Sequence, residues 1–420
     1  MTEKSKKNKN KVPRRKIDLV VLLIMMLVAA AFLVMLTVVD AFPADIVMTL
    51  VGVLFALLIV SGVFLLGKKR WMNNVGIVLA LVFVILYGAG VYYMTSTYAM
   101  FAKISSTQVE RVENEQGIDV TQDPFNIYIT GIDQWNKTRG LDLERSDVNM
   151  IITVSPKSRK IMLTSIPRDA YVPLHRTGTM DKLTHTGIYG VDETLNTVQD
   201  WTGVKINYYV KANFDACVDL VDAIGGIDIY NPVEFKSALN GHLYEKGNLH
   251  LKGRGALYYA RERKAFEGED QLRVKNQLVV VKAILDKVMT SPALITSYGD
   301  IMKVLGDEVE TDIPTSDMQA LVKMQLADLR KWDIQSQRMS GNYEMEIVAS
   351  MDPSNKYQVL KVSKKSFDSC LDGIEKTMNP TEEEIAAVEN EKRKSALSSF
   401  IKSLTGGNKA ETEVTEESDQ

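Results

Sequence analysis

"FNIYITGID", residues 125–133, is the stretch that decides the fold of the globular part of this chain. Apolar side chains occupy alternate positions, so a strand here places its phenylalanine and two of its isoleucines on one face. Two similar runs follow, "VNMIITVS" (148–155) and "RKIMLTSIP" (159–167), and the polar turn "SPKSRK" connects them. The pattern predicts three strands close together in the sequence, with a globular core that begins at Phe125.

Helices and strands alternate after these three strands. The expected elements, in chain order, are a helix at 191–203 with a terminal glycine, a strand at 204–213, a helix at 214–226 that ends in "GG", a strand at 227–233, a short helix from about Gly253 and a long helix from Asp270. Such mixed alternation is typical of a sheet covered by helices on its faces. The sequence therefore predicts an α/β/α sandwich with a mixed central sheet.

The first quarter of the chain is membrane-like. Three apolar runs, 19–39, 46–66 and 75–94, each have about the 20 residues that span a hydrocarbon core as a helix. A cleaved signal peptide is the alternative for the first run, but that run is long for a signal sequence and two further spans follow it. We expect three transmembrane helices within residues 17–94.

Basic residues flank these runs unevenly. Residues 1–16 form a basic N-terminus, "KKR" at 68–70 separates the second and third runs, and "DAFPAD" between the first two has no base. By the positive-inside rule the N-terminus is cytoplasmic, and the chain after Met94 lies outside the membrane.

Charge and cysteine content narrow the function of the outer part. After residue 94 the chain carries 39 Lys and Arg against 49 Asp and Glu, a net charge of −10. That balance argues against a nucleic-acid partner, so any site for an anion must be local. Cys217 and Cys370 are the only cysteines, which excludes a disulfide scaffold but leaves one bridge open.

Other segments complete the expected organisation. Residues 95–121 are polar with little periodicity, as in a stalk or a short accessory helix, and the main domain is expected at 122–290. An extension over 291–378 has a helical pattern to about Trp332 and strand candidates in "MEIVAS" and "YQVLKV". In the last segment, 379–420, Thr381 and Glu384 form a capping box for a charged helix before an acidic tail with the composition of a disordered segment.

One stretch, "YYARERKAFEGEDQLRVKNQ" at 258–277, is unusually rich in cations. If Arg261 and Arg263 lie on extended chain, they point to the same side. Arg273 and Gln277 are four residues apart and share a face of the helix that follows. A helix N-terminus also attracts anions, so the stretch predicts a clamp for a multiply negative ligand.

Charged residues also stand at the ends of the first three strands. Asp133 follows the first strand, Arg145 and Asp147 begin the second, and Arg168 follows the third. Side chains at such strand ends converge on sites in α/β sheets. Taken singly they have local explanations, because Pro-Arg-Asp is commonly a turn with its own ion pair and Asp147 can bond the backbone.

Several motifs carry a resemblance to a known family. They are "ERSDVNM", "LTSIPRDAYV", "NYYVKANF", "LVDAIGGIDI", "LKGRGALYYARER" and "DQLRVKNQ". Their order and spacing over about residues 122 to 290 are similar to those of the LytR-CpsA-Psr phosphotransferases of bacterial cell envelopes. Lys182 also matches a family lysine near the substrate entrance, although a surface lysine is the simpler interpretation.

The resemblance implies a role for each matched residue. The residues implied around the pyrophosphate of a polyprenyl-linked glycopolymer are Arg145, Arg168, Arg261, Arg263, Asp270, Arg273 and Gln277. Asp133 and Asp147 would hold Mg²⁺ or Mn²⁺, and together with Arg168, Arg261 and Arg263 they form the implied catalytic set. Physical chemistry agrees, since guanidinium forks suit phosphate oxygens and two carboxylates beside a pyrophosphate need a cation between them. Asp270 would orient the arginines, or cap its own helix.

The implied activity is transfer of a glycopolymer, such as teichoic acid or capsule, from undecaprenyl pyrophosphate to peptidoglycan at the outer face of a bacterial membrane. An apolar groove between sheet and helices is expected for the prenyl tail. Two alternatives stay open: a regulator that binds polyprenyl phosphates without turnover, and a hydrolase that uses water as acceptor. The presence of both aspartates favours transfer, because a sensor needs only the cations.

Overall fold

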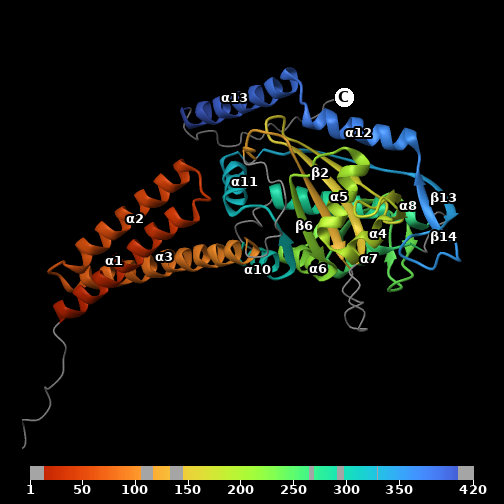
Figure 1. Cartoon of the computed structure of the whole chain (residues 1–420). Coiled ribbons are helices and arrows are strands. Elements are labelled where there is room, and N and C mark those ends of the chain that lie inside the picture. Colours follow the sequence, from red (N-terminus) through yellow and green to blue (C-terminus); the bar gives the residue numbers. More distant parts are fainter. Residues whose placement is uncertain are drawn as a thin grey trace, which may run out of the picture.

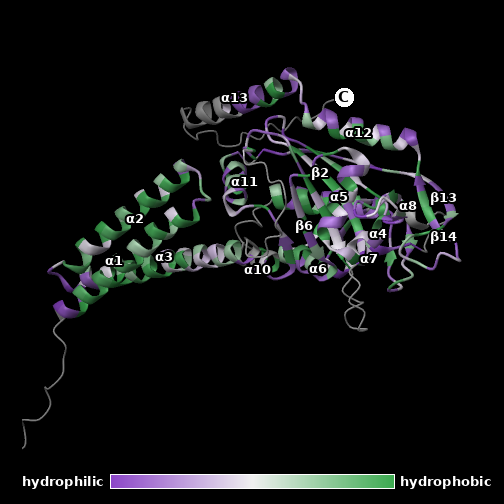
Figure 2. Ribbon diagram, in the orientation of Figure 1, coloured by the Kyte–Doolittle hydropathy of each residue, from purple (hydrophilic) through white to green (hydrophobic). Residues whose placement is uncertain are grey.

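The computed structural model describes residues 14–105, 117–132, 145–263, 269–290, 298–328 and 330–404. Two parts are visible in Figure 1, a bundle of long helices and an α/β domain. The bundle consists of α1 (Arg14–Val39), α2 (Ala44–Leu65) and α3 (Arg70–Ser105). Within the described residues, these are the helices long and apolar enough to cross a membrane. Figure 2 shows their mostly hydrophobic composition, which confirms the expectation of three spans.

Close contacts hold the three helices together. Gly76 of α3 lies against the backbone of Leu65, where an added Cβ would come within 2.5 Å of the Leu65 nitrogen. Near the same end, Asn73 donates to the Asp18 carboxylate at 2.8 Å and to the Leu65 carbonyl at 2.9 Å. These bonds satisfy polar groups that would be costly in an apolar bundle.

The third helix does not stop at the end of its apolar run. Met100 and Phe101, near its end, are buried in a cluster with residues of the α/β domain. Lys103 forms an ion pair with Asp307 at 2.5 Å. The segment from residue 95, expected to be a stalk or a separate short helix, instead continues α3 to Ser105 and packs into the domain.

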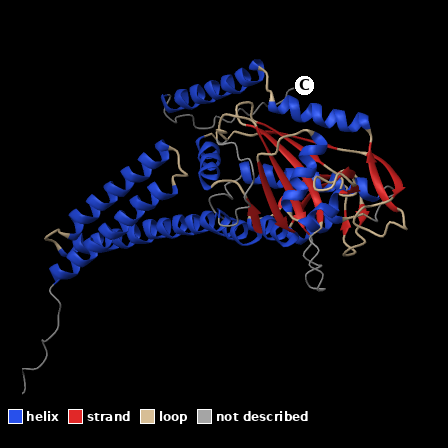
Figure 3. Ribbon diagram, viewed as in Figure 1, coloured by secondary structure: helices blue, strands red, loops and turns tan. Residues whose placement is uncertain are grey.

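Six strands form the central sheet in the described part of the chain (Figure 3). Their order is β11 (Val309–Thr311), β6 (Tyr208–Asn213), β1 (Phe125–Ile132), β2 (Ser146–Ser155), β3 (Lys160–Ser165) and β12 (Asp333–Arg338). β1 is parallel to β6 and antiparallel to β2, while β3 is antiparallel to β2 and parallel to β12. The carboxyl ends of β6, β1, β3 and β12 and the amino end of β2 therefore share one edge, which we call the site edge.

Both faces of this sheet are covered. The helices involved are α4 (Leu183–Thr186), α5 (Val191–Thr202) and α12 (Lys364–Met378) on one face and α8 (Glu269–Thr290) and α11 (Thr315–Ala327) on the other. Tyr128 and Tyr209 are fully buried under the first group, and Phe125 and Met150 are buried under the second. The predicted sandwich with a mixed sheet is confirmed.

Smaller elements surround the sandwich. The remaining helices are η2 (Gly187–Tyr189), α6 (Phe214–Ala223), α7 (Gly253–Arg261), α10 (Tyr298–Glu308) and α13 (Glu382–Leu404). The remaining strands of the described residues form four two-stranded antiparallel pairs: β4 (Tyr171–Pro173) with β5 (Met180–Lys182), β7 (Ile227–Asn231) with β10 (Gly247–Leu251), β8 (Phe235–Lys236) with β9 (Leu243–Tyr244), and β13 (Gly341–Glu346) with β14 (Tyr357–Val362).

The C-terminal extension differs from its sequence prediction. β11 interrupts the region expected to be helical as far as Trp332, and β12 was not expected at all. β13 starts four residues before the predicted strand "MEIVAS" and overlaps only its first two residues. β14 coincides with "YQVLKV". Because β11 and β12 are the two edge strands, the sheet continues past residue 290, where the main domain was expected to end.

Two other expectations can be checked. The capping box at the start of α13 is present, since the Thr381 amide donates to Glu384 at 2.9 Å and the Glu384 amide donates to the Thr381 hydroxyl at 3.3 Å. Cys217 and Cys370 are free thiols rather than a bridge.

Candidate functional site

The site edge gathers the charged residues singled out at strand ends. Asp147 is the second residue of β2, and Arg168 follows β3 by three positions. The Arg168 guanidinium donates through Nη1 to Asp147 Oδ1 at 2.6 Å. Both side chains are mostly buried, with 24% and 17% of their surfaces exposed. The pair therefore joins two antiparallel neighbours of the sheet, so Arg168 is more than part of a local turn.

A second carboxylate holds Arg168 from its other side. Asp169 lies 3.5 Å from Arg168 Nε and 3.1 Å from Lys182 Nζ. Burial on its own raises the pKa of Asp169, but Arg168, Lys182 and Arg273 outweigh it and hold the pKa of that carboxyl below its usual value. Asp169 therefore stays ionised at neutral pH and fixes the two cations that flank it.

Helix α8 brings the next pair of predicted residues to the same place. Arg273 and Gln277 lie one turn apart in its first half and are 6% and 9% exposed. Arg273 is among the cations that lower the pKa of the Asp169 carboxyl, so it acts on the same carboxylate as Arg168 and Lys182. Val274 and Leu278, the next residue in each case, are buried, and Leu278 packs under the sheet. Asp270 belongs to the first turn of α8, but its side chain lies outside the described residues.

Arg261 is positioned differently from its sequence prediction. It is the last residue of α7 and not part of an extended segment, because the apolar pattern of "ALYYA" continues the helix up to it. Its guanidinium carbon lies 4.6 Å from the centroid of the Phe214 ring, within cation–π range. Phe214 begins α6 directly after β6, so Arg261 lies at the β6 side of the site edge.

A buried carboxylate, Glu262, fixes the chain directly after α7. Glu262 is fully buried and accepts hydrogen bonds from the Arg263 amide and the Ala238 amide, both at 2.9 Å. This carboxylate ties the end of α7 to the loop before β9. Arg263 is half-buried and follows Glu262, whose backbone is extended at the end of α7. That Arg261 and Arg263 point to the same side stays a prediction.

The structure gives less detail for two of the predicted site residues, Arg145 and Asp133. Arg145 directly precedes β2 and is exposed, as expected of a cation available to a ligand. Asp133 follows the last residue of β1 and lies outside the described residues.

Asp147 is the described carboxylate of the implied metal pair. No group of three or more His, Cys, Asp or Glu side chains with metal-binding geometry occurs among the described residues. Mg²⁺ does not require one, because it keeps several waters and is commonly held by one or two carboxylates and substrate phosphates. Asp147, at the site edge beside the end of β1, fits that kind of donor set.

The sequence interpretation missed part of this network. The local ion pair expected within Pro-Arg-Asp is present between Arg168 and Asp169, but the link from Asp169 to Lys182 was not expected, because it depends on the β4–β5 hairpin folding back. Lys182 was expected at the surface, but its side chain is 17% exposed and ion-paired. The family match of Lys182 was the signal that could have found it.

Comparison with known proteins assigns the family. The model of the LytR_cpsA_psr family matches residues 91–374, about two thirds of the chain. This chain belongs to the LytR_cpsA_psr family. The match includes all six strands of the central sheet and most of α12.

Individual relatives agree. Proteins named polyisoprenyl-teichoic acid–peptidoglycan teichoic acid transferase TagU are 33% identical over 252 residues in Bacillus mycoides and 34% identical over 251 residues in Bacillus anthracis; each match covers 57% of this LytR_cpsA_psr chain and 79% of the relative. The crystal structure of Bacillus subtilis TagV is 28% identical, with a TM-score of 0.50, and covers 62% of this chain and 99% of that one.

Proposed function

We propose that this protein is a membrane-anchored transferase that moves a teichoic-acid-type glycopolymer from a polyprenyl pyrophosphate carrier to peptidoglycan. The observation that carries the proposal is Arg168, held between Asp147 and Asp169 at the site edge, with Arg273 acting electrostatically on the same Asp169 carboxylate. A buried group of guanidinium cations is suited to a pyrophosphate. The names of the TagU relatives supply the substrate class.

The reaction breaks one phosphoanhydride bond. A peptidoglycan hydroxyl oxygen attacks the phosphorus that bears the glycan, the bond from that phosphorus to the bridging oxygen breaks, and polyprenyl phosphate leaves with the electron pair. The product is a phosphodiester between glycopolymer and peptidoglycan, and the acceptor proton passes to solvent or to a carboxylate. Charge grows on the bridging and leaving oxygens, so positioned cations are expected to supply most of the rate enhancement.

Each group of residues has a defined task in this scheme. Arg168, held by Asp147 and Asp169, and the buried Arg273 would bind the pyrophosphate oxygens, and the buried Gln277, one turn after Arg273 on α8, would donate to them. Arg261 and Arg263 approach from the end of α7, and Arg145 approaches from the start of β2. Asp133 and Asp147 would hold Mg²⁺ or Mn²⁺, which when bound neutralises charge on the phosphate oxygens.

The anchor places the domain where polyprenyl lipids reside. With the N-terminus cytoplasmic, as the basic residues at 1–16 and 68–70 indicate, the α/β domain faces outward. A reporter active only outside the cytoplasm should work when fused after residue 105 and fail when placed in the 66–69 loop. The reverse pattern would contradict both the orientation and the envelope function.

Transfer itself needs a defined assay. Full-length protein in detergent is incubated with a lipid-linked teichoic acid precursor and a peptidoglycan oligomer, and products are identified by mass. A covalent polymer–peptidoglycan adduct with release of polyprenyl phosphate is the expected result. Free polymer phosphate without adduct would indicate the hydrolase, and tight lipid binding without any product would indicate the regulator.

A further inference from the structure

Helix α4 holds the backbone that presents Arg168. The Thr184 amide donates to the Arg168 carbonyl at 2.8 Å, and the Leu183 amide donates to the Ala170 carbonyl at 2.9 Å. Both amides belong to the first turn of α4, where backbone N–H groups have no partner within the helix. The loop that carries Arg168 supplies those partners, so the conformation of this loop depends on where α4 lies.

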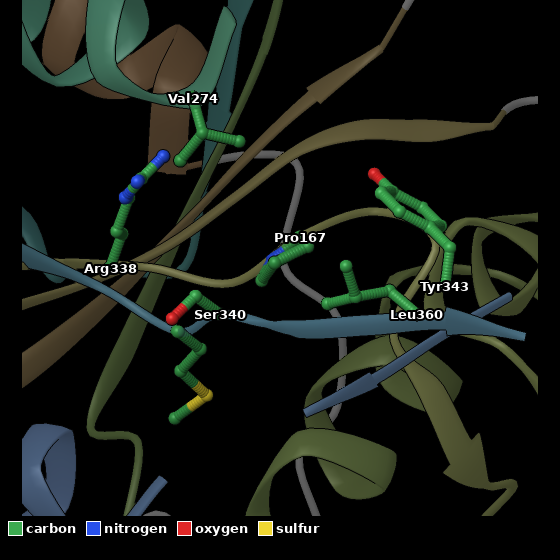
Figure 4. Close-up of a pocket in the computed structure, with 7 residues that line it drawn as sticks. Pro167, Val274, Arg338, Ser340, Tyr343 and Leu360 are labelled. Atoms are coloured by element: carbon green, nitrogen blue, oxygen red, sulfur yellow. The ribbon is translucent and has the colours of Figure 1, made fainter. Parts of the chain in front are cut away.

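The β13–β14 pair holds the same loop. The Leu360 amide of β14 donates to the Asp169 carbonyl at 2.8 Å. Leu360 also lines a small pocket together with Pro167, the residue before Arg168 (Figure 4). Two elements that are far apart in the sequence, α4 and β14, thus bind consecutive residues of one loop. Arg168 keeps its position only if these two elements keep theirs.

A polar cluster joins the two elements. It consists of Asp181 in β5, His185 in α4 and Ser350 in the loop between β13 and β14, and Asp181 and His185 are 0% and 4% exposed. His185 Nδ1 lies 2.7 Å from Asp181 Oδ1 and 2.8 Å from Ser350 Oγ, and the Ser350 amide donates to Asp181 Oδ2 at 2.8 Å. Lys182 extends the link to the site, because its amide donates to Asp181 Oδ1 at 2.6 Å and its ammonium pairs with Asp169 at 3.1 Å.

The chemistry of this cluster suits it to holding segments together. Burial on its own raises the pKa of Asp181, but hydrogen bonds from His185, Lys182 and Ser350 outweigh it and hold the pKa of that carboxyl below its usual value. An ionised carboxylate only accepts, so His185 Nδ1 carries a proton that it shares between Asp181 Oδ1 and Ser350 Oγ. Because both contacts use the same ring nitrogen, His185 cannot relay a proton from Ser350 to Asp181, as the base of a nucleophilic triad does.

We propose that Asp181, His185 and Ser350 form a positioning cluster for the pyrophosphate site, because they hold α4 and the β13–β14 pair in the arrangement that fixes Arg168. The proposal rests on the proposed function, since the effect of the cluster on the ligand passes through Arg168. The three residues act through another side chain, so they are positioning residues and not catalytic ones.

The test is a double-mutant cycle with affinity as the readout. Full-length protein in detergent is titrated with undecaprenyl pyrophosphate, at a temperature below the melting transition of every variant. His185→Leu removes a donor from a buried carboxylate and should weaken binding about tenfold when Arg168 is present, the factor that one hydrogen bond to a charged group supplies. In an Arg168→Gln background the same substitution should weaken binding by less than about twofold, because the residue through which it acts is absent.

Two milder variants keep the proposal testable if His185→Leu does not fold. His185→Asn keeps an N–H donor close to the place of Nδ1, so its affinity should stay within about twofold of wild type. Ser350→Ala keeps the amide bond to Asp181 and loses the hydroxyl, so a loss of about threefold is expected with Arg168 present and none with Arg168→Gln.

The Asp228–His250 pair provides a matched control, since it has the same 2.7 Å contact on an exposed strand pair. His250→Leu should leave the affinity unchanged. Equal losses from His185→Leu in the two Arg168 backgrounds, or wild-type affinity in folded His185→Leu and Ser350→Ala, would overturn the positioning cluster alone. Wild-type protein that does not bind undecaprenyl pyrophosphate would overturn the proposed function together with it.

Discussion

Arg168 and Arg261 lie at different positions of one site edge, and the fold holds them in different ways. Arg168 follows a central strand and has carboxylates on two sides, at 2.6 Å and 3.5 Å. Arg261 ends a helix and rests on the face of Phe214. A guanidinium fixed by ion pairs is already oriented before a ligand arrives, whereas contact with an aromatic face is a weaker constraint. We infer that Arg168 contributes to both fold and function, and Arg261 chiefly to function.

The largest effect is expected from Arg168→Lys, which tests whether Arg168 serves both the fold and the function. Lysine keeps the charge but cannot contact Asp147 and Asp169 together with a planar fork, so at least one of these two contacts is lost. We expect transfer to fall at least about a hundredfold, with a melting temperature several degrees lower, since each charge-assisted bond contributes about 1.5–3 kcal/mol. Both readouts come from product formation and thermal melting of the full-length protein. Arg254→Lys, at an exposed position, should change neither, and wild-type transfer in Arg168→Lys would remove Arg168 from the site.

Asp169→Asn should affect stability next most strongly, with a defined pH dependence. The pKa of Asp169 is lowered in the folded state, so the carboxylate stabilises the fold above the unfolded pKa of about 3.9 and this contribution is lost as pH falls through the folded pKa. The variant should melt several degrees lower at pH 7, and the difference should shrink below about pH 4. Thermal melting across pH 3 to 7 measures this.

A surface carboxylate provides the control for Asp169. The pKa of Asp228 is also lowered, chiefly by its hydrogen bond with His250, but this side chain is 68% exposed. Solvent screens such a pair, so Asp228→Asn should melt close to wild type at every pH. Equal effects of the two substitutions would contradict the structural role assigned to Asp169.

How much of this the sequence could predict depends on what forms each element. β1, β2 and β3 were predictable because their alternating apolar residues fill both sheet faces, and α5 because Gly203 adopts a left-handed φ of 70° at its end. β12, "DIQSQR", has only Ile334 fully buried, so it is a strand because it pairs with β3 and not because of its own pattern. β11, with three residues, is too short for a periodicity to be recognised.

The residues of the candidate site also differ in how far the sequence could predict them. Arg168 and Asp147 were predictable from their places at strand ends, since the antiparallel pairing of β2 and β3 brings those ends together. Lys182 arrives through the β4–β5 hairpin, whose three-residue strands are too short to leave a periodic signal in the sequence. The contact of Arg261 with Phe214 joins two helices 47 positions apart and was equally invisible.

Arg261→Lys tests whether Arg261 serves chiefly the function. It should lower affinity for undecaprenyl pyrophosphate by about tenfold, because the fork is lost, while the melting temperature stays close to wild type. Phe214→Leu keeps an apolar neighbour but removes the aromatic face, so a smaller loss of about two- to fivefold is expected, as for a cation–π contact of about 0.5–1 kcal/mol. Affinity by calorimetry and melting by fluorescence report the two effects separately. A large loss of stability in Arg261→Lys would place Arg261 with Arg168 as a structural residue.

The central claim, that carboxylates and arginines at this edge carry out metal-assisted transfer, is tested most directly by Asp133→Asn combined with Asp147→Asn. Amides keep the shape of both side chains but remove the charge that attracts a hard cation. Product formation is measured across a Mg²⁺ titration, with lipid affinity and melting temperature determined for the same samples. We predict that transfer collapses and no longer responds to Mg²⁺, while lipid binding weakens less because the arginines remain. Unchanged Mg²⁺-dependent product formation in the double variant would contradict the account.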